Sequence, residues 1–195
     1  QLSVKYRVPW VTQFDLTGIS DFAYFKRPIN DGSAPEQSGG RLYNKLTAAY
    51  PMTRTWGYVT PSVSLQHLYT QFDQESADAN GLDKNSKSQS IFVPQFSIDS
   101  GLNFFKTGTP FGKFDDSLGG YQLLSPRLKY VYSPYKDQTD VPNFNTRLAS
   151  LNFSQLYEDS WFLGYDRLPD NNHLTPSLNY RYIDGNGLTR LDASV

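Results

Sequence analysis

Apolar and polar residues alternate at every second position through several long segments of this 195-residue chain. In residues 120–133 the apolar positions are Leu124, Pro126, Leu128, Tyr130 and Tyr132, and the polar positions are Ser125, Arg127, Lys129 and Ser133. Successive side chains of a β-strand point to opposite faces, so this period predicts strands with one apolar and one polar face. We expect eight strands, at residues 1–8, 14–26, 41–50, 57–72, 89–106, 120–133, 172–184 and 187–195.

The composition agrees with an all-β chain. There are 14 Tyr, 13 Phe and 3 Trp beside 14 Gly and 12 Pro, a mixture that suits pleated surfaces and turns. No apolar run approaches the roughly 18 residues of a membrane-spanning helix. A formal charge of -1 gives no general attraction to nucleic acid, and the absence of Cys excludes disulfides and thiolate metal sites.

The connections between these strands differ systematically in length. Short connections at residues 9–13, 51–56 and 184–187 alternate with long polar ones at 27–40, 73–88 and 134–171, and residues 107–119 are intermediate. Longer extracellular loops and shorter periplasmic turns are typical of outer-membrane barrels. We therefore predict an antiparallel transmembrane β-barrel segment of about eight meandering strands. Two alternatives remain: a small self-contained porin-like or anchoring barrel, and a soluble carbohydrate-binding β-sandwich, which also alternates.

Two segments resemble a known family. Residues 123–146 contain PYKDQTD at the end of a strand, and residues 160–182 contain GYDRLPDNN at the entry to the next one. Both are similar to the barrel of the outer-membrane lipopolysaccharide-assembly family, LptD, and residues 93–105 fit the strand that precedes them. The resemblance implies that residues 1–195 are a fragment from the middle of one barrel domain.

The same resemblance implies a function and a set of partners. The fragment would be an integral part of the bacterial outer membrane, in the wall of a translocon that assembles lipopolysaccharide into the outer leaflet. An LptE-like lipoprotein would plug the barrel, and periplasmic bridge proteins would deliver lipopolysaccharide through an N-terminal domain outside this chain. The resemblance implies neither a cofactor nor an enzymatic activity.

Seven cations lie on the polar faces of the expected strands: Lys5, Arg7, Lys45, Arg127, Lys129, Arg181 and Arg190. If these faces line the barrel interior, the cations are suited to bind the phosphates and acidic sugars of lipopolysaccharide. Alternatively, they pair with carboxylates of loops folded into the barrel and form only its lining.

The connection at residues 134–171 is long enough to fold into or over the barrel. Its residues that match the family motifs are Tyr135, Asp137, Asp140, Asp166, Arg167 and Asn171. We interpret them as a loop that braces the plug, with ordinary turn chemistry as the alternative. Asp166 and Arg167 are sequence neighbours on an extended loop and should point apart, so each needs a partner elsewhere.

The chain carries no strong signal for catalysis or metal binding. His67 shares its strand face with Val63, Leu65 and Tyr69, and His173 has neither a Cys nor a nearby second His. No G-x-S-x-G nucleophile motif occurs. We therefore predict no catalytic residue, no metal site and no cofactor.

Overall fold

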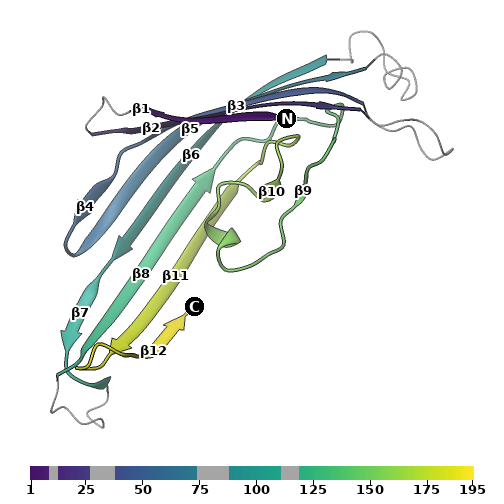
Figure 1. The fold of residues 1–195 in the computed structure, drawn as a ribbon. Helices are drawn as coiled ribbons and strands as arrows, with labels where there is room; N and C mark the ends of the chain where they lie inside the picture. The colour runs from purple at the N-terminus through teal and green to yellow at the C-terminus, as the bar shows by residue number, and fades with distance from the viewer. Residues whose placement is uncertain (9–12, 27–37, 74–87, 111–118) are drawn as a thin grey trace. The chain divides into compact units, whose positions relative to one another are not determined.

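The computed structural model describes residues 1–8, 13–26, 38–73, 88–110 and 119–195, and its fold is an antiparallel β-meander (Figure 1). The main sheet within these residues contains β1 (Leu2–Val8), β2 (Asp15–Phe25), β3 (Gly39–Ala49), β4 (Met52–Arg54), β5 (Gly57–Phe72), β6 (Ser88–Leu102), β7 (Phe104–Thr107), β8 (Tyr121–Tyr132), β11 (Asn172–Ile183) and β12 (Thr189–Ser194). Hydrogen-bonded neighbours follow the order β1-β2-β3-β5-β6-β8-β11-β12, with β4 paired to β5 and β7 to β8.

The segment between β8 and β11 contributes smaller elements of its own. It contains β9 (Arg147–Leu148), β10 (Phe162–Leu163) and a single 3-10 turn at Gln155–Tyr157, and β9 pairs with β10 in a separate two-stranded sheet. Among the residues that the structure describes, no helix is both long and apolar enough to cross a membrane.

The predicted all-β, antiparallel fold class is confirmed, with local differences in the strands. The expected strand at residues 89–106 is interrupted at Asn103, whose backbone N–H donates to the Trp56 carbonyl at 2.8 Å. The expected turn at residues 51–56 contains β4, in which Met52 pairs with Val59. Both differences depend on cross-strand hydrogen bonds, which a single-strand pattern does not encode.

The chain divides into two compact units. Unit 1 comprises residues 1–50, 62–97 and 131–172, and unit 2 comprises residues 51–61, 98–130 and 173–195.

Unit 1 has an exposed apolar face. Leu2 lies opposite Phe22 and Leu46 lies opposite Leu65, and all four side chains are exposed. A soluble β-sandwich would bury these apolar rows against a second sheet. Their exposure within unit 1 is the arrangement expected of a surface that faces lipid.

The opposite face of unit 1 is buried and mostly polar. Its buried polar residues on the strands are Asp21, Arg41, Ser64, Gln66, Thr70, Gln95 and Ser97. The hydrophobic core also lies on this side, where Tyr43, Leu68 and Val93 of β3, β5 and β6 pack with Val141 and Leu168 of the segment after β8. The polar face therefore carries an apolar patch that the alternation did not predict.

Unit 2 contains the β11–β12 hairpin and the paired ends of β4, β5, β7 and β8. Gly187 adopts φ 81° in the hairpin turn, a conformation that glycine adopts without strain. The Gly187 N–H donates to the Asp184 carbonyl at 2.9 Å, which closes the turn predicted at residues 184–187. On β11 and β8 the apolar positions Leu174, Leu178 and Leu128 are exposed.

Candidate functional site

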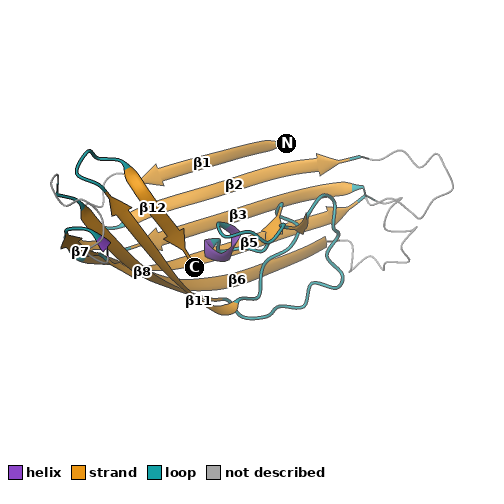
Figure 2. Ribbon diagram, turned by 90° about the horizontal axis from the view of Figure 1, so that it is seen from below, coloured by secondary structure: helices purple, strands orange, loops and turns teal. Residues whose placement is uncertain are grey.

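Residues 134–171, here called the docked loop, pack on the polar face of unit 1 over β3 and β5 (Figure 2). Tyr165 of the loop stacks on Tyr43 of β3, with ring centroids 4.4 Å apart and planes inclined by 10°. Phe144 stacks on Phe25 of β2 at 4.8 Å. The loop is therefore held by apolar and aromatic packing on a face that is otherwise polar.

Arg41 of β3 lies at the centre of this interface and is only 1% exposed. Its guanidinium donates to Asp166 of the loop at 2.6 Å, to Asp21 of β2 at 3.0 Å and to Asn145 of the loop at 2.9 Å. One buried cation thus compensates two buried carboxylates. Buried charges need this combination of pairing and hydrogen bonding, because desolvation costs each of them several kcal/mol.

Two further polar groups of Asp166 also have partners. Its second carboxylate oxygen accepts from the Asn145 backbone N–H at 2.7 Å, and its own N–H donates to the Thr146 hydroxyl at 2.8 Å. Gly164, at φ 111°, has no room for a Cβ, which would lie 2.4 Å from the Thr146 hydroxyl oxygen. Glycine at this position lets the chain turn and bring Asp166 down to Arg41.

Two aromatic rings cover the Arg41 guanidinium. Its central carbon lies 5.3 Å from the Phe25 ring centroid and 5.6 Å from that of Tyr165. Such contacts stabilise a desolvated cation through the negative face of the ring. Together with the two carboxylates, these rings explain how a charged arginine can be buried beneath the docked loop.

Lys45 makes a second connection between β3 and the loop. Its ammonium lies 3.6 Å from an Asp159 carboxylate oxygen and 3.3 Å from the side-chain carbonyl oxygen of Gln95. The Asp159 backbone carbonyl accepts from the side-chain amides of Gln95 and Asn171, each at 2.8 Å. Asp159 therefore connects the docked loop to β3 and β6, and it also contacts Asn171 at the end of the loop.

The two ends of the docked loop are tied to each other. The Ser133 N–H donates to the Asn171 carbonyl at 2.7 Å, and the Asn171 N–H donates to the Ser133 hydroxyl at 2.9 Å. The Gln138 side-chain amide both donates to the Leu168 carbonyl and accepts from the Leu168 N–H, each at 2.8 Å. These pairs close a loop of nearly forty residues at its base.

The predicted loop residues fall into different environments. Asp166 and Asn171 are buried in the contacts above, whereas Tyr135 and Asp140 are exposed. The Arg167 guanidinium donates to the backbone carbonyls of Asp166 at 2.9 Å and of Pro142 at 3.2 Å, and partial burial lowers its pKa. Asp137 accepts from the Thr139 hydroxyl and N–H, and these hydrogen bonds lower the pKa of its carboxyl.

Several predicted lining cations have carboxylate partners. Arg127 forms a double hydrogen bond with Asp99, Arg181 pairs with Asp192 at 2.7 Å, and Arg190 pairs with Asp184 at 2.7 Å. Lys129 is buried and Lys5 is exposed. The Arg7 side chain lies outside what the structure describes. Lys45 pairs with a carboxylate of the docked loop, Asp159, whereas the pairs of Arg127, Arg181 and Arg190 join neighbouring strands or lie within a hairpin.

The sequence analysis missed three residues of the site: Arg41, Asp21 and Asp159. Arg41 could have been found, because it shares the strand face of Lys45 and lies four positions before it. Asp21 lies on the strand whose two faces are both mixed in polarity, so its orientation was not predictable from the pattern. Within the described residues, no group of three or more His, Cys, Asp or Glu side chains is arranged to hold a metal ion.

Comparison with known proteins places the whole chain in one family. The family model described as LptD, LPS transport system D, matches residues 1–195. The chain belongs to the LptD family. A relative named LPS-assembly protein LptD from Psychrobacter cryohalolentis is 62% identical over 195 residues, which cover all of this chain and 20% of that relative.

Two further LptD relatives carry the same name. The Psychrobacter arcticus protein is 61% identical over all of this chain and 21% of its own length. The Acinetobacter baumannii protein is 42% identical over 176 residues, which cover 90% of this chain and 20% of the relative. This LptD-family chain therefore spans about a fifth of the length of the relatives it matches. The predicted family is confirmed over the whole chain.

Proposed function

We propose that this chain is part of the wall of an outer-membrane barrel that assembles lipopolysaccharide into the outer leaflet. The observation that carries the proposal is a two-faced sheet in an LptD-family chain, with exposed apolar rows on one face of unit 1 and buried polar residues on the other. In this role the apolar rows face acyl chains, and the polar face with its docked loop lines the interior.

Lipopolysaccharide is the substrate that this proposal assigns to the interior. Its phosphates and acidic sugars would meet the cations Lys5, Arg7, Lys45, Arg127, Lys129, Arg181 and Arg190. An arginine already paired with an aspartate is a weaker anion ligand than a free one, because the carboxylate competes for the same donors. Lys5, which is exposed, is therefore the strongest candidate contact.

A charge-reversal series tests this substrate assignment. We expect Lys5→Glu, Arg127→Glu and Arg181→Glu, combined in the full-length protein, to reduce the delivery of lipopolysaccharide to the cell surface, because they replace attraction by repulsion. The control is Arg127→Glu with Asp99→Arg, which reverses an ion pair and keeps its net charge. If the triple variant shows unchanged lipopolysaccharide delivery and unchanged plug binding, these cations only line the interior and do not bind the substrate.

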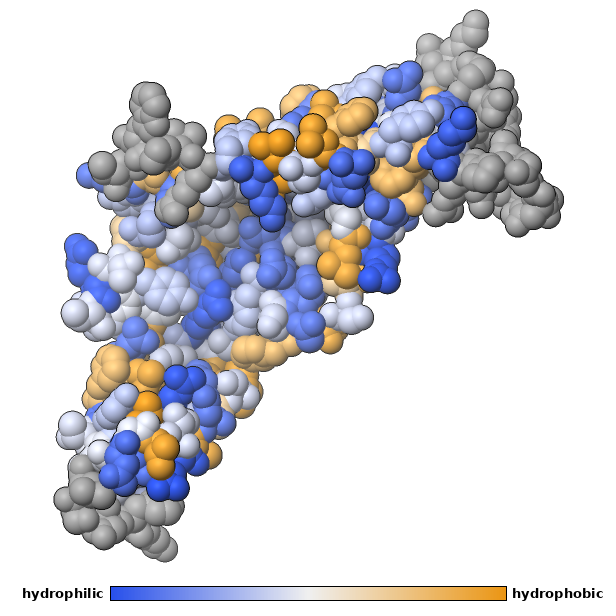
Figure 3. Space-filling model, in the orientation of Figure 1, coloured by the Kyte–Doolittle hydropathy of each residue, from blue (hydrophilic) through white to orange (hydrophobic). Residues whose placement is uncertain are grey.

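We also propose that the docked loop contacts an LptE-like plug lipoprotein, while periplasmic bridge proteins engage a part of the protein outside this chain. The large apolar side chains that the loop exposes include Leu148, Leu151, Phe153 and Leu163. Apolar surface (orange) is interspersed with hydrophilic surface on the side of the molecule that the loop occupies (Figure 3). Exposed apolar side chains on a loop are candidate contacts for another protein.

Site-specific photocrosslinking tests the plug contact. A photoreactive residue at Leu151 in the full-length protein should crosslink to the plug lipoprotein, because that side chain is 73% exposed on the docked loop. The same residue at Leu65, which is exposed on the apolar face of unit 1, is the control and should crosslink to lipid only. Equal plug crosslinking from both positions would refute this contact.

A further inference from the structure

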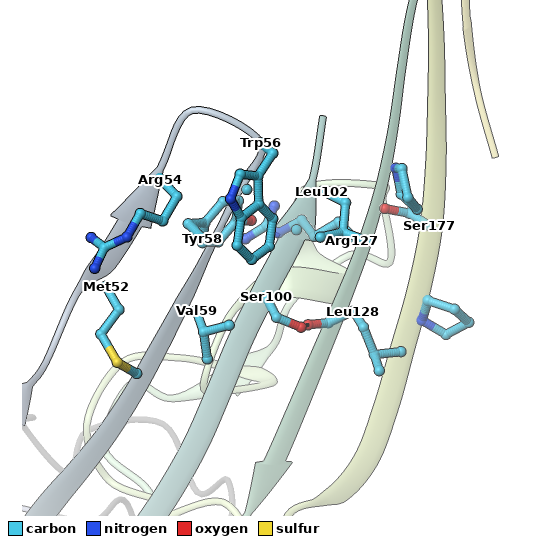
Figure 4. Close-up of a pocket in the computed structure, with 14 residues that line it drawn as sticks. Met52, Arg54, Trp56, Tyr58, Val59, Ser100, Leu102, Arg127, Leu128 and Ser177 are labelled. Atoms are coloured by element: carbon cyan, nitrogen blue, oxygen red, sulfur yellow. Dashed lines mark hydrogen bonds between the residues drawn. The ribbon is translucent and has the colours of Figure 1, made fainter. Parts of the chain in front are cut away.

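Unit 2 contains an apolar groove on the sheet face that carries its exposed apolar rows (Figure 4). Val59, Leu102 and Leu128 line it, and each is at least 40% exposed. Ser100 is a small residue on the same strand face as Leu102, so the space between Val59, Leu102 and Leu128 stays open. The Ser100 hydroxyl donates to the Leu128 carbonyl at 3.2 Å. The groove measures about 750 Å³, within the roughly 300–1,000 Å³ of typical small-ligand sites.

One end of this groove carries a cation. Arg54 of β4 lies opposite Gly57 in the β4–β5 register and Met52 lies opposite Val59, so Arg54 shares the sheet face of the apolar row. Its guanidinium donates to the Thr53 carbonyl at 3.0 Å and forms no ion pair within the described part of the chain. Trp56, 63% exposed, lies beside it in the turn.

A cation on the lipid-facing side of a barrel is tolerated close to the bilayer surface, where the guanidinium can reach head groups. Tryptophan is enriched at the same depth. β4 and the turn after it belong to the short connection at residues 51–56, and short connections mark the periplasmic rim of such barrels. The groove therefore opens toward lipids of the periplasmic leaflet.

We propose that this groove binds one anionic glycerophospholipid of the periplasmic leaflet, with an acyl chain between Val59, Leu102 and Leu128 and the phosphate on Arg54. The inference rests on the proposed membrane role of the chain. The apolar lining fits a hydrocarbon chain, and the single cation at its end fits a phosphate. Arg127 and Tyr58, which also line the groove, both donate to Asp99, so Arg54 is the lining cation that an anion can bind without displacing a carboxylate.

Native mass spectrometry of the delipidated full-length protein tests the site. Phosphatidylglycerol and phosphatidylethanolamine with identical acyl chains are added back separately. We expect the wild type to retain one phosphatidylglycerol in preference to phosphatidylethanolamine. Arg54→Gln should weaken phosphatidylglycerol retention about tenfold through loss of a charge-assisted contact. Ser100→Leu should fill the groove and reduce retention of both lipids.

Lys106→Gln is the matched control, because Lys106 is an exposed cation of unit 2 that does not line the groove. Its retention of phosphatidylglycerol should equal that of the wild type. Retention unchanged in both Arg54→Gln and Ser100→Leu would overturn the proposal. Displacement of phosphatidylglycerol by an equal concentration of lipopolysaccharide would also overturn it, because the groove would then be a lipopolysaccharide site.

The recovery of wild-type protein in the outer membrane and its delivery of lipopolysaccharide are measured in parallel. If only the groove proposal is wrong, membrane recovery and lipopolysaccharide delivery stay intact, and lipid retention is the same in every variant. If the proposed function is wrong, the wild type itself shows neither outer-membrane recovery nor lipopolysaccharide delivery, whatever lipid the variants retain.

Discussion

Arg41 holds the docked loop through charges that have no access to water. Asp21 reaches it from β2 and Asp166 from the loop, and both carboxylates are fully buried. Removing one partner of such a cluster leaves uncompensated charge in a low-dielectric site, whereas exposed pairs contribute little because water screens them. Arg41 and the exposed pair of Arg181 and Asp192 should therefore respond very differently to the same substitution.

We expect Arg41→Met in the full-length protein to destabilise the closed loop by about 3–5 kcal/mol, the usual cost of breaking a buried pair. Arg181→Met should cost less than about 1 kcal/mol, because its pair is exposed. Hydrogen exchange of the Asn145, Asp166 and Leu168 amides, which are hydrogen-bonded in the closed loop, measures the free energy of opening. Similar exchange in both variants would mean that the buried cluster does not hold the loop.

A triple variant separates charge from packing. Arg41→Met combined with Asp21→Asn and Asp166→Asn removes the cation and both carboxylates together. Neutral amides carry no uncompensated charge, so we expect this variant to recover part of the amide protection that Arg41→Met loses. If it recovers none, the cost of losing Arg41 comes from packing on Phe25 and Tyr165.

Among the elements, the β11–β12 hairpin has a turn that is stabilised by one carboxylate, that of Asp184. Asp184 accepts from the N–H groups of Asn186 and Leu188 and from the Arg190 side chain. The Arg190 hydrogen bond, followed by those from the backbone, holds the Asp184 pKa below its ordinary value. A lowered pKa means that this carboxylate stabilises the folded turn above its unfolded pKa of about 3.9 and stops doing so as pH falls through the folded value.

Amide exchange as a function of pH tests this turn. The Asn186 and Leu188 amides should lose protection, corrected for intrinsic exchange, as the pH falls from about 6 to about 3, through the carboxylate range. Asp184→Asn should show weaker protection at the upper pH and little further loss on acidification. A wild-type profile without any acid-induced loss would contradict the role of Asp184.

The element boundaries show which parts of the fold are local. The expected strand at 57–72 matches β5, and the expected strand at 172–184 matches β11 to within one residue, because alternation and turn residues lie within each segment. The interruption at Asn103 depends on the Trp56 carbonyl in the turn between β4 and β5. Such long-range hydrogen bonds leave no periodic signal in the sequence.

At the scale of the whole molecule, the sheet formed by the described residues begins with β1 and ends with β12, so each of these strands has one hydrogen-bonded neighbour in that order. Unpaired backbone groups cost several kcal/mol each in hydrocarbon. Edges of this kind also favour pairing with another chain. The 195-residue chain should therefore need neighbouring strands for a stable membrane fold.

We expect the 195-residue chain, when expressed alone, to self-associate or to require detergent, because its edge strands and exposed apolar rows are then uncovered. Light scattering measures the mass of the species in solution. A comparison chain extended by the neighbouring strands of the full-length protein should associate less. A monodisperse, detergent-free monomer of the 195-residue chain would rule out this expectation.

The alternation of side chains predicted most of the strands and the apolar exterior of unit 1, because the two faces of a strand are set by neighbouring residues. The lengths of the connections predicted the antiparallel meander. The alternation could not predict the partner of Arg41, since Asp166 lies 125 residues away in the sequence. Nor could it show that Tyr43, Leu68 and Val93 form an apolar core beneath the docked loop. Burial and ion pairing depend on which segments meet in space, and only folding brings those segments together.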